Sequence, residues 1–263
     1  MVHTLAARTD DKAGVFKAAA PAPASPPPPS ALADAPSGTA SGGALTAQAF
    51  PGVPSVGALF FDGGGTAALH YCSASVVHSE AGNLIVTAAH CVYGSTFNGY
   101  QDHILFVPGY HDGTAPYGTW VATSAVLDKR WIASSDPDAD VAFLRVREVG
   151  GTGTATLESR TGAGRFKSEP SYTDTVDVIG YPFGAEEPVS CETPTARYSA
   201  TQLLFNCGGF PDGTSGGPFL TADGSVEGVV GGYQQGGDTP QISYSSYFGA
   251  GVDALYRAAD ARS

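Results

Sequence analysis

Three residues in separate parts of the chain could together activate a nucleophile. His90 lies in TAAHC, Asp140 lies in DADVAFLRV, and Ser215 lies in DGTSGGPF. A serine hydroxyl becomes a nucleophile when a neighbouring imidazole takes its proton, and a carboxylate can orient that imidazole and stabilise its charged form. Taken singly, a histidine is most often a packing or surface residue, and an aspartate before a strand is most often a turn residue. The chemistry therefore requires that all three side chains converge.

The order of these residues along the chain decides between two arrangements. GTSGG around Ser215 fits the G-x-S-x-G elbow, in which the histidine follows the serine. The last histidine is His111, so the elbow is excluded. The order histidine, aspartate, serine, with gaps of 50 and 75 residues, fits side chains that meet in a cleft between two β-barrels. The amides of Gly213 and Ser215 could then bind an oxyanion, while Gly216 and Gly217 leave room for substrate.

Short β-strands are predicted to position these residues. About eleven apolar runs are rich in Val, Ile, Phe, Tyr and Thr and are separated by Gly, Pro, Asn and Asp, which is typical of a sandwich or barrel. Asp223 and Gly224 predict a tight hairpin turn between two of these runs. The runs lie at residues 56–61, 71–77, 84–89, 103–110, 119–127, 141–146, 175–182, 202–207, 217–220, 226–233 and 242–248.

The two ends of the chain differ from this β-rich middle. Residues 251–262 repeat apolar side chains at helical spacing and predict a C-terminal α-helix. Residues 18–50 are dominated by Ala, Pro, Ser and Gly and show almost no periodic apolar pattern. We therefore interpret residues 1–50 as a disordered pro-segment or linker, and residues 51–263 as one folded domain.

The motifs around His90, Asp140 and Ser215 together resemble the trypsin/chymotrypsin-type serine peptidase family. The sequence is similar to its secreted bacterial, glutamyl-endopeptidase-like branch, from about Val53 to the C-terminal helix. The resemblance implies an all-β, chymotrypsin-like fold of two six-stranded antiparallel barrels with a C-terminal α-helix, and a barrel junction near residues 125–170. It also implies an endopeptidase that works through an acyl-enzyme on Ser215, with His90 as base and Asp140 orienting it.

Two positions depart from the family pattern. Trypsin-like enzymes usually carry Asp before the nucleophile, where it captures the N-terminus released on activation, but Thr214 stands here. A zymogen of this chain would therefore be activated differently. Gly209 stands where enzymes selective for Arg or Lys place Asp, so a basic-specific pocket is not supported. We expect Gly209, Gly231, Gly232 and Tyr233 to bind substrate, the last three partly through backbone atoms.

The cysteine pattern gives a hypothesis about the compartment. Cys72, Cys91, Cys191 and Cys207 permit three pairings, and pairing of sequence neighbours closes the shortest loops. The family resemblance implies a bond between Cys72 and Cys91, and Cys191 with Cys207 would brace the segment before Ser215. Disulfides form in oxidising places, so we expect a secreted protein whose signal peptide is not present in this chain.

The charge balance limits the classes of partner. The chain has 25 acidic residues against 13 Lys and Arg, a net charge of −12. Nucleic acids and anionic membranes attract clustered positive charge, so neither is expected as a partner. No apolar run reaches the roughly 18 to 20 residues of a membrane helix. We expect a monomer that needs no cofactor and acts on protein or peptide substrates.

Two other functions are alternatives to the peptidase. The first is a catalytically silent, peptidase-like binding protein, which the departures at Thr214 and in the pocket leave open. The second is a metal site built from His70, Cys72, His90 and Cys91, which are zinc-type ligands close in sequence. Adjacent residues on an extended strand point to opposite faces, so His90 and Cys91 would not easily share one ion. No metal site is therefore expected.

Overall fold

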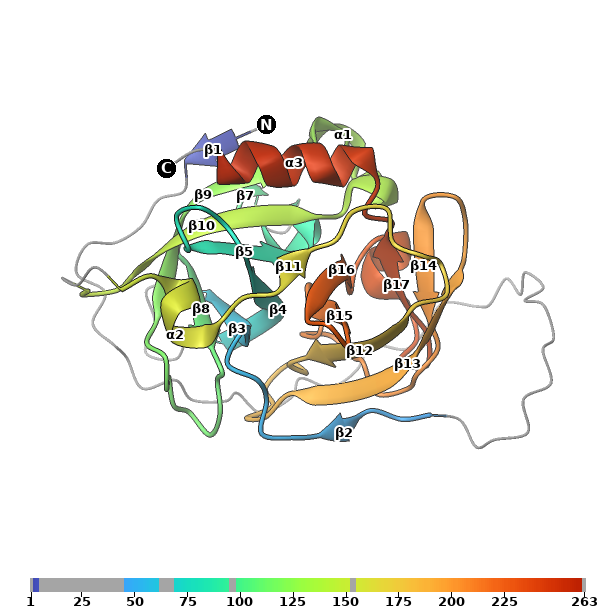
Figure 1. Cartoon of the computed structure of the whole chain (residues 1–263), viewed down its shortest axis with the longest axis horizontal. Coiled ribbons are helices and arrows are strands. Elements are labelled where there is room, and N and C mark those ends of the chain that lie inside the picture. The colour runs from blue at the N-terminus through green and yellow to red at the C-terminus, as the bar shows by residue number, and fades with distance from the viewer. Residues whose placement is uncertain (1, 5–44, 62–68, 95–97, 152–154, 262–263) are drawn as a thin grey trace.

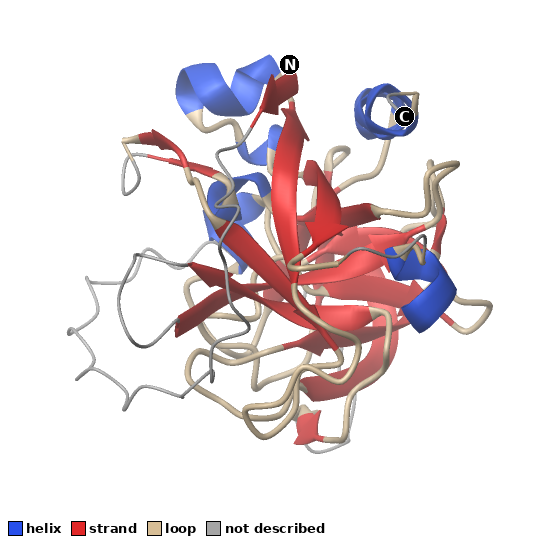
Figure 2. Cartoon of the chain, turned by 90° about the vertical axis from the view of Figure 1, so that its left-hand side faces the viewer, coloured by secondary structure: helices blue, strands red, loops and turns tan. Residues whose placement is uncertain are grey.

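The structure is a computed structural model that describes residues 2–4, 45–61, 69–94, 98–151 and 155–261. Its strands form two main sheets, with the helices at the periphery (Figures 1 and 2). The strands are β1 (Val2–Thr4), β2 (Gln48–Ala49), β3 (Val56–Phe61), β4 (Leu69–Val77), β5 (Leu84–Thr87), β6 (Tyr93–Gly94), β7 (Gly99–Tyr100), β8 (Ile104–Pro108), β9 (Trp120–Leu127), β10 (Ala142–Glu148), β11 (Arg165–Phe166), β12 (Thr175–Gly180), β13 (Val189–Arg197), β14 (Gln202–Phe205), β15 (Pro218–Thr221), β16 (Ser225–Val229) and β17 (Ser243–Ser246). The helices are α1 (Lys129–Ser134), α2 (Leu157–Thr161) and α3 (Ala250–Asp260), with short 3-10 turns η1 (Ala89–Cys91), η3 (Pro137–Ala139) and η4 (Tyr233–Gly236).

The first sheet closes into a six-stranded antiparallel barrel. Its strand order is β9-β10-β5-β4-β3-β8, and pairing of β8 with β9 completes the ring. Alternate residues of each strand fill the interior, so Leu59, Ile85, Phe106, Trp120 and Leu144 pack in one fully buried cluster. Because the ring is closed, this barrel has no free sheet edge. The residues that precede and follow its strands therefore lie at the two ends of the barrel.

The second sheet forms the other half of the molecule. Its strands run in the order β16-β15-β12-β13-β14-β17, with β11 added parallel to β16 and β2 added to β13. The two ends of this series meet because the Gly231 N–H, just after β16, donates to the Tyr244 carbonyl of β17 at 2.9 Å. Val178, Leu203 and Phe219 lie in the buried cluster inside it.

The C-terminal helix α3 packs on the first barrel, where Figure 1 shows it in red across β9 and β10. Its buried residues Val252 and Ala259 join a cluster with Phe143 of β10 and with Val229 and Phe248 of the second half. The helix therefore covers the place where the two halves meet. In the part of the chain that is described, no helix is long and apolar enough to cross a membrane.

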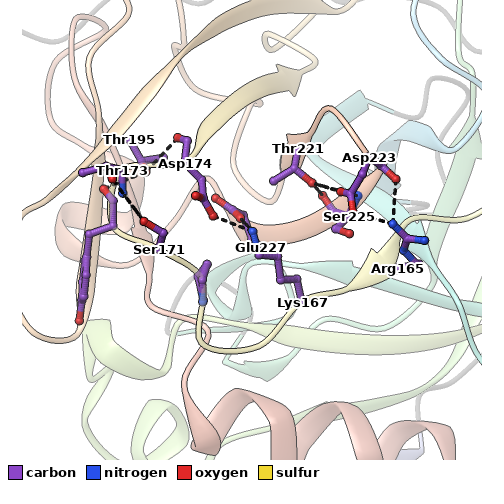
Figure 3. Close-up of polar contacts among 12 residues, drawn as sticks. Arg165, Lys167, Ser171, Thr173, Asp174, Thr195, Thr221, Asp223, Ser225 and Glu227 are labelled. Carbon is purple, nitrogen blue, oxygen red and sulfur yellow. Dashed lines mark hydrogen bonds and ion pairs between the residues drawn. The ribbon is translucent and has the colours of Figure 1, made fainter.

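A partly exposed ion cluster joins residues that follow β11 and precede β12 to a buried residue of β16 (Figure 3). The Lys167 ammonium contacts a carboxylate oxygen of Asp174 at 2.6 Å and of Glu227 at 2.8 Å. Glu227 is fully buried, and its other oxygen has no partner among the described residues. Burial raises the pKa of Glu227 to about 7, although the Lys167 contact opposes the shift. This carboxyl group is therefore a source of pH-dependent stability.

The structure confirms the predicted fold class. Each of the predicted apolar runs overlaps a strand, the Asp223–Gly224 hairpin joins β15 to β16, and the C-terminal helix is present. The disulfides are Cys72–Cys91 and Cys191–Cys207, as predicted. Residues 5–44, which hold most of the Pro- and Ala-rich segment, lie outside the described residues, so the pro-segment or linker stays a prediction.

Candidate active site

His90 and Asp140 meet at one edge of the first barrel. His90 lies in η1 directly after β5, and Asp140 follows η3 and precedes β10. Because β5 and β10 are antiparallel neighbours, with Thr87 opposite Ala142, the end of one and the start of the other lie together. His90 Nδ1 lies 2.8 Å from Asp140 Oδ2, and the His90 backbone N–H donates to Asp140 Oδ1 at 2.8 Å.

The Asp140 carboxylate is completely buried and accepts three hydrogen bonds. Besides the two from His90, the Gly232 N–H donates to Oδ2 at 2.9 Å. A carboxylate can only accept, so hydrogen bonding to the Asp140 carboxylate requires a proton on His90 Nδ1, and in the neutral imidazole with that proton Nε2 is an acceptor. Asp140 thus fixes both the orientation and the tautomer of the imidazole.

The Asp212–Gly213 peptide is held by a hydrogen bond to its carbonyl, which fixes the direction of the Gly213 N–H. The Phe183 N–H donates to the Asp212 carbonyl at 2.7 Å. Because the peptide is planar and trans, the Gly213 N–H points opposite to that carbonyl. The Gly213 φ is +95°, and a Cβ there would lie 2.3 Å from the Phe183 nitrogen, so this close approach requires glycine.

The Thr214–Ser215 peptide is held in the same manner. The Gly217 N–H donates to the Thr214 carbonyl at 2.9 Å, which directs the Ser215 N–H to the other side. Within the described residues, the amides of Gly213 and Ser215 donate to no acceptor. Thr214 itself is buried and both its N–H and its hydroxyl donate to the Pro211 carbonyl, so the loop is anchored there without an ion pair.

Two adjoining pockets open beside Ser215. His90, Gly213 and Ser215 line a pocket of about 520 Å³, so the structure brings these predicted residues to one hollow. A second pocket of about 400 Å³ also reaches Ser215. Both are lined in addition by Asp212, Gln235, Gly237 and Asp238. Two aspartates therefore line both pockets together with Ser215, and His90 and Gly213 line the larger one.

The four residues predicted to bind substrate are not among the residues that line these two pockets. Gly209, Gly231, Gly232 and Tyr233 are absent from the linings of both pockets. The Gly232 N–H contacts Asp140, and the Tyr233 N–H donates to Gln202 Oε1 at 3.0 Å. The Gly209 N–H donates to the carbonyl of Pro240. Their part in substrate binding stays a prediction.

Sequence reasoning missed several residues that shape the site. Gln234 and Gln235 both have φ of 53°, in the left-handed region, and form the η4 turn at the pocket wall. Gln202 holds the start of this turn through Tyr233. Ser73 of β4 contacts the Ser215 loop from the first barrel. No local motif marks these residues, because each acts through contacts with distant parts of the chain.

Two of the residues in the alternative metal site, Cys72 and Cys91, are not available as thiolate ligands. Ligand atoms of Cys72, His90 and Cys91 lie within 4.8 Å of one another. However, both sulfurs are joined in a disulfide, and thiolates are the form that binds zinc. His70, the fourth member of that set, is buried with its Nε2 2.9 Å from the Ala185 carbonyl.

Comparisons with known proteins place this arrangement in a family. A model of the trypsin-like peptidase domain matches residues 72–229, more than half of the chain. The chain belongs to the trypsin-like peptidase family. Among solved structures, this peptidase is similar to the protease Anisep from Arthrobacter nicotinovorans, with TM-score 0.70 and 25% identity, over 82% of this chain and 100% of that one. A Glu endopeptidase shares the fold, with TM-score 0.68 and 18% identity, over 84% and 99% of the two chains.

One curated relative also matches the peptidase. An extracellular metalloprotease of Bacillus subtilis (strain 168) is 31% identical over 104 residues, which are 38% of this chain and 32% of that protein. The match thus spans about a third of that relative's length. The family match and the structural similarities together support a peptidase hydrolase with the chymotrypsin-like fold.

Proposed function

We propose that this trypsin-like peptidase is a serine endopeptidase that uses Ser215, His90 and Asp140 as a catalytic triad. The observation that supports this most directly is the buried Asp140 carboxylate, 2.8 Å from His90 Nδ1, in a hollow that also contains Ser215. The amides of Gly213 and Ser215, which donate to no acceptor in the described part of the chain, supply a place for an oxyanion beside the same residue.

The reaction follows from these positions. His90 Nε2 takes the Ser215 hydroxyl proton as Oγ bonds to the carbonyl carbon of the scissile peptide. The Gly213 and Ser215 amides stabilise the oxyanion of the tetrahedral intermediate, and the buried Asp140 stabilises the imidazolium. The C–N bond then breaks, the proton passes from Nε2 to the leaving amine, and water hydrolyses the acyl-enzyme by the same route.

The substrates and compartment are part of the same proposal. The family acts on peptide bonds, so we assign protein or peptide substrates to this chain. The two disulfides favour an oxidising, extracellular place of action. Mass spectrometry of protein purified without reductant should show a gain of four hydrogens on reduction, and a protein with four free thiols would contradict export.

The test is digestion of a diverse peptide pool by the folded protein and by Ser215→Ala, with cut sites identified by mass spectrometry. The wild-type protein should produce a defined set of internal cuts, and Ser215→Ala should lose them. Equal cutting by both proteins would assign the activity to a contaminant. A folded wild-type protein that cuts no peptide would favour a silent binding protein.

A further inference from the structure

Ser73 connects the first barrel to the loop that carries Ser215. It lies in β4, next to Cys72, and is fully buried. Its backbone N–H donates to the Ser215 carbonyl at 2.7 Å, and its hydroxyl donates to the Gly213 carbonyl at 2.9 Å. The same hydroxyl oxygen accepts the Tyr181 N–H at 2.8 Å.

We propose that the Ser73 hydroxyl is a positioning residue for the oxyanion loop, holding Gly213 so that its amide faces the reacting carbonyl oxygen. This inference rests on the proposed function, because the loop has this task only if Ser215 is acylated. Ser73 does not touch the substrate in this account. It acts through Gly213, on which the hydroxyl bond is made.

The pattern of bonds along the loop makes the hydroxyl distinctive. The carbonyls of Asp212, Gly213, Thr214 and Ser215 each accept one hydrogen bond. Three of the donors are backbone N–H groups, and the donor to Gly213 is the Ser73 side chain. It is therefore the one of the four restraints that a point substitution can remove while the backbone is left intact.

Gly213 is also where the loop most needs a restraint. Glycine rotates about φ and ψ more freely than other residues, and Gly213 already has φ of +95°. The Phe183 N–H fixes the peptide before Gly213, and the Ser73 hydroxyl fixes the peptide after it. Since Tyr181 N–H occupies the acceptor side of the hydroxyl, the hydroxyl proton is directed toward Gly213.

Loss of the hydroxyl should weaken binding of the transition state more than binding of substrate. The Gly213 carbonyl would then be free to rotate toward other donors. That rotation would change the backbone conformation of Gly213 and move the Gly213 N–H from its oxyanion position. Loss of one oxyanion donor typically costs about 10²- to 10³-fold in kcat. Because the Phe183 bond remains, we expect Ser73→Ala to lower kcat by about 10- to 100-fold with little change in KM.

Ser75 supplies a matched control on the same strand. It is also a buried serine of β4, and its hydroxyl has no hydrogen-bond partner among the described residues. The experiment measures kcat, KM and the affinity for a peptidyl boronic acid, which forms a tetrahedral adduct, for wild type, Ser73→Ala and Ser75→Ala. A thermal unfolding curve for each variant reports on the fold.

The inference predicts that Ser73→Ala loses kcat and boronate affinity in parallel, while Ser75→Ala keeps both within about threefold of wild type. Wild-type kcat in a folded Ser73→Ala, or equal losses in the two variants, would overturn it. If Ser73→Ala does not fold, the isosteric pair Ser73→Thr and Ser73→Val tests the hydroxyl, and equal kcat in that pair overturns the inference. An inactive wild-type protein contradicts the proposed function, whereas an active wild type with an active Ser73→Ala contradicts this inference alone.

Discussion

Replacing Asp140 with Asn tests how the buried carboxylate supports His90. In the native site, Oδ1 accepts the His90 N–H, and Oδ2 accepts both His90 Nδ1–H and the Gly232 N–H. An asparagine offers one oxygen and one NH₂ group to these three donors. If its oxygen takes the Oδ1 position, the NH₂ faces Nδ1 and shifts the imidazole proton to Nε2, where it blocks proton abstraction. If its oxygen takes the Oδ2 position, the His90 N–H loses its acceptor.

The expected loss can be estimated from these contacts. Either orientation removes the negative charge that stabilises the imidazolium, and a hydrogen bond to a charged group contributes about 1.5–3 kcal/mol. That loss alone corresponds to about 10- to 150-fold in kcat. In the orientation with NH₂ toward Nδ1, the His90 imidazole also has the wrong tautomer. The loss in kcat then approaches the order of 10⁴-fold that this change causes in Ser-His-Asp sites.

The assay is steady-state cleavage of a peptide selected from the pool digestion, with wild type and Asp140→Asn compared at equal folded concentration. We expect kcat to fall by at least about tenfold, with a smaller change in KM. A matched control is Asp136→Asn, which changes an aspartate at the start of η3 and should leave kcat unchanged. An Asp140→Asn protein with wild-type kcat would refute the role assigned to Asp140.

Three further predictions concern stability and specificity. The pKa of Glu227 is raised to about 7 from 4.5, so as pH rises the unfolded chain loses this proton before the folded protein does. Between about pH 4.5 and pH 8, the free energy of unfolding of the wild type, measured in urea, should fall by roughly 3 kcal/mol relative to that of Glu227→Gln, and a constant difference would contradict this. Replacing Cys72 and Cys91 with Ala should lower the free energy of unfolding by about 3 kcal/mol, and an unchanged denaturation midpoint would count against the estimate. Gly209 gives no support to a pocket selective for Arg or Lys, but Asp212 and Asp238 line the pockets beside Ser215 and supply negative charge from other positions. Cleavage after Lys or Arg should therefore exceed cleavage after Glu, and cut sites dominated by Glu would disprove this.

Much of the fold could be predicted because the strands carry local signals. Runs such as residues 84–87 and 104–108 are almost entirely apolar segments, and every residue in them is buried in the barrel wall. β13, in contrast, was not predicted. Its sequence VSCETPTAR is largely polar and contains Pro194, and only two of its residues are buried. Pairing with β12, β14 and β2 makes it a strand, and no local pattern reports that pairing.

The candidate site shows the same division. His90, Asp140 and Ser215 could be proposed from the sequence because the side chains that do chemistry are of few types and lie in short motifs. The pocket walls could not, because they depend on a change of chain direction after Gly232, whose φ is +77° and whose amide is held by Asp140. This bond spans 92 residues of sequence. The same holds for Ser73, whose contact with Gly213 spans 140 residues.

The central claim is that the Ser215 hydroxyl is activated by His90. The most direct test treats the folded protein with a peptidyl phosphonate and locates the adduct by mass spectrometry, with Ser215→Ala and His90→Ala as controls. The account predicts one adduct per molecule, on Ser215, which Ser215→Ala abolishes and His90→Ala slows severely. An adduct on another residue, or a Ser215 adduct that forms at the same rate without His90, would contradict the account.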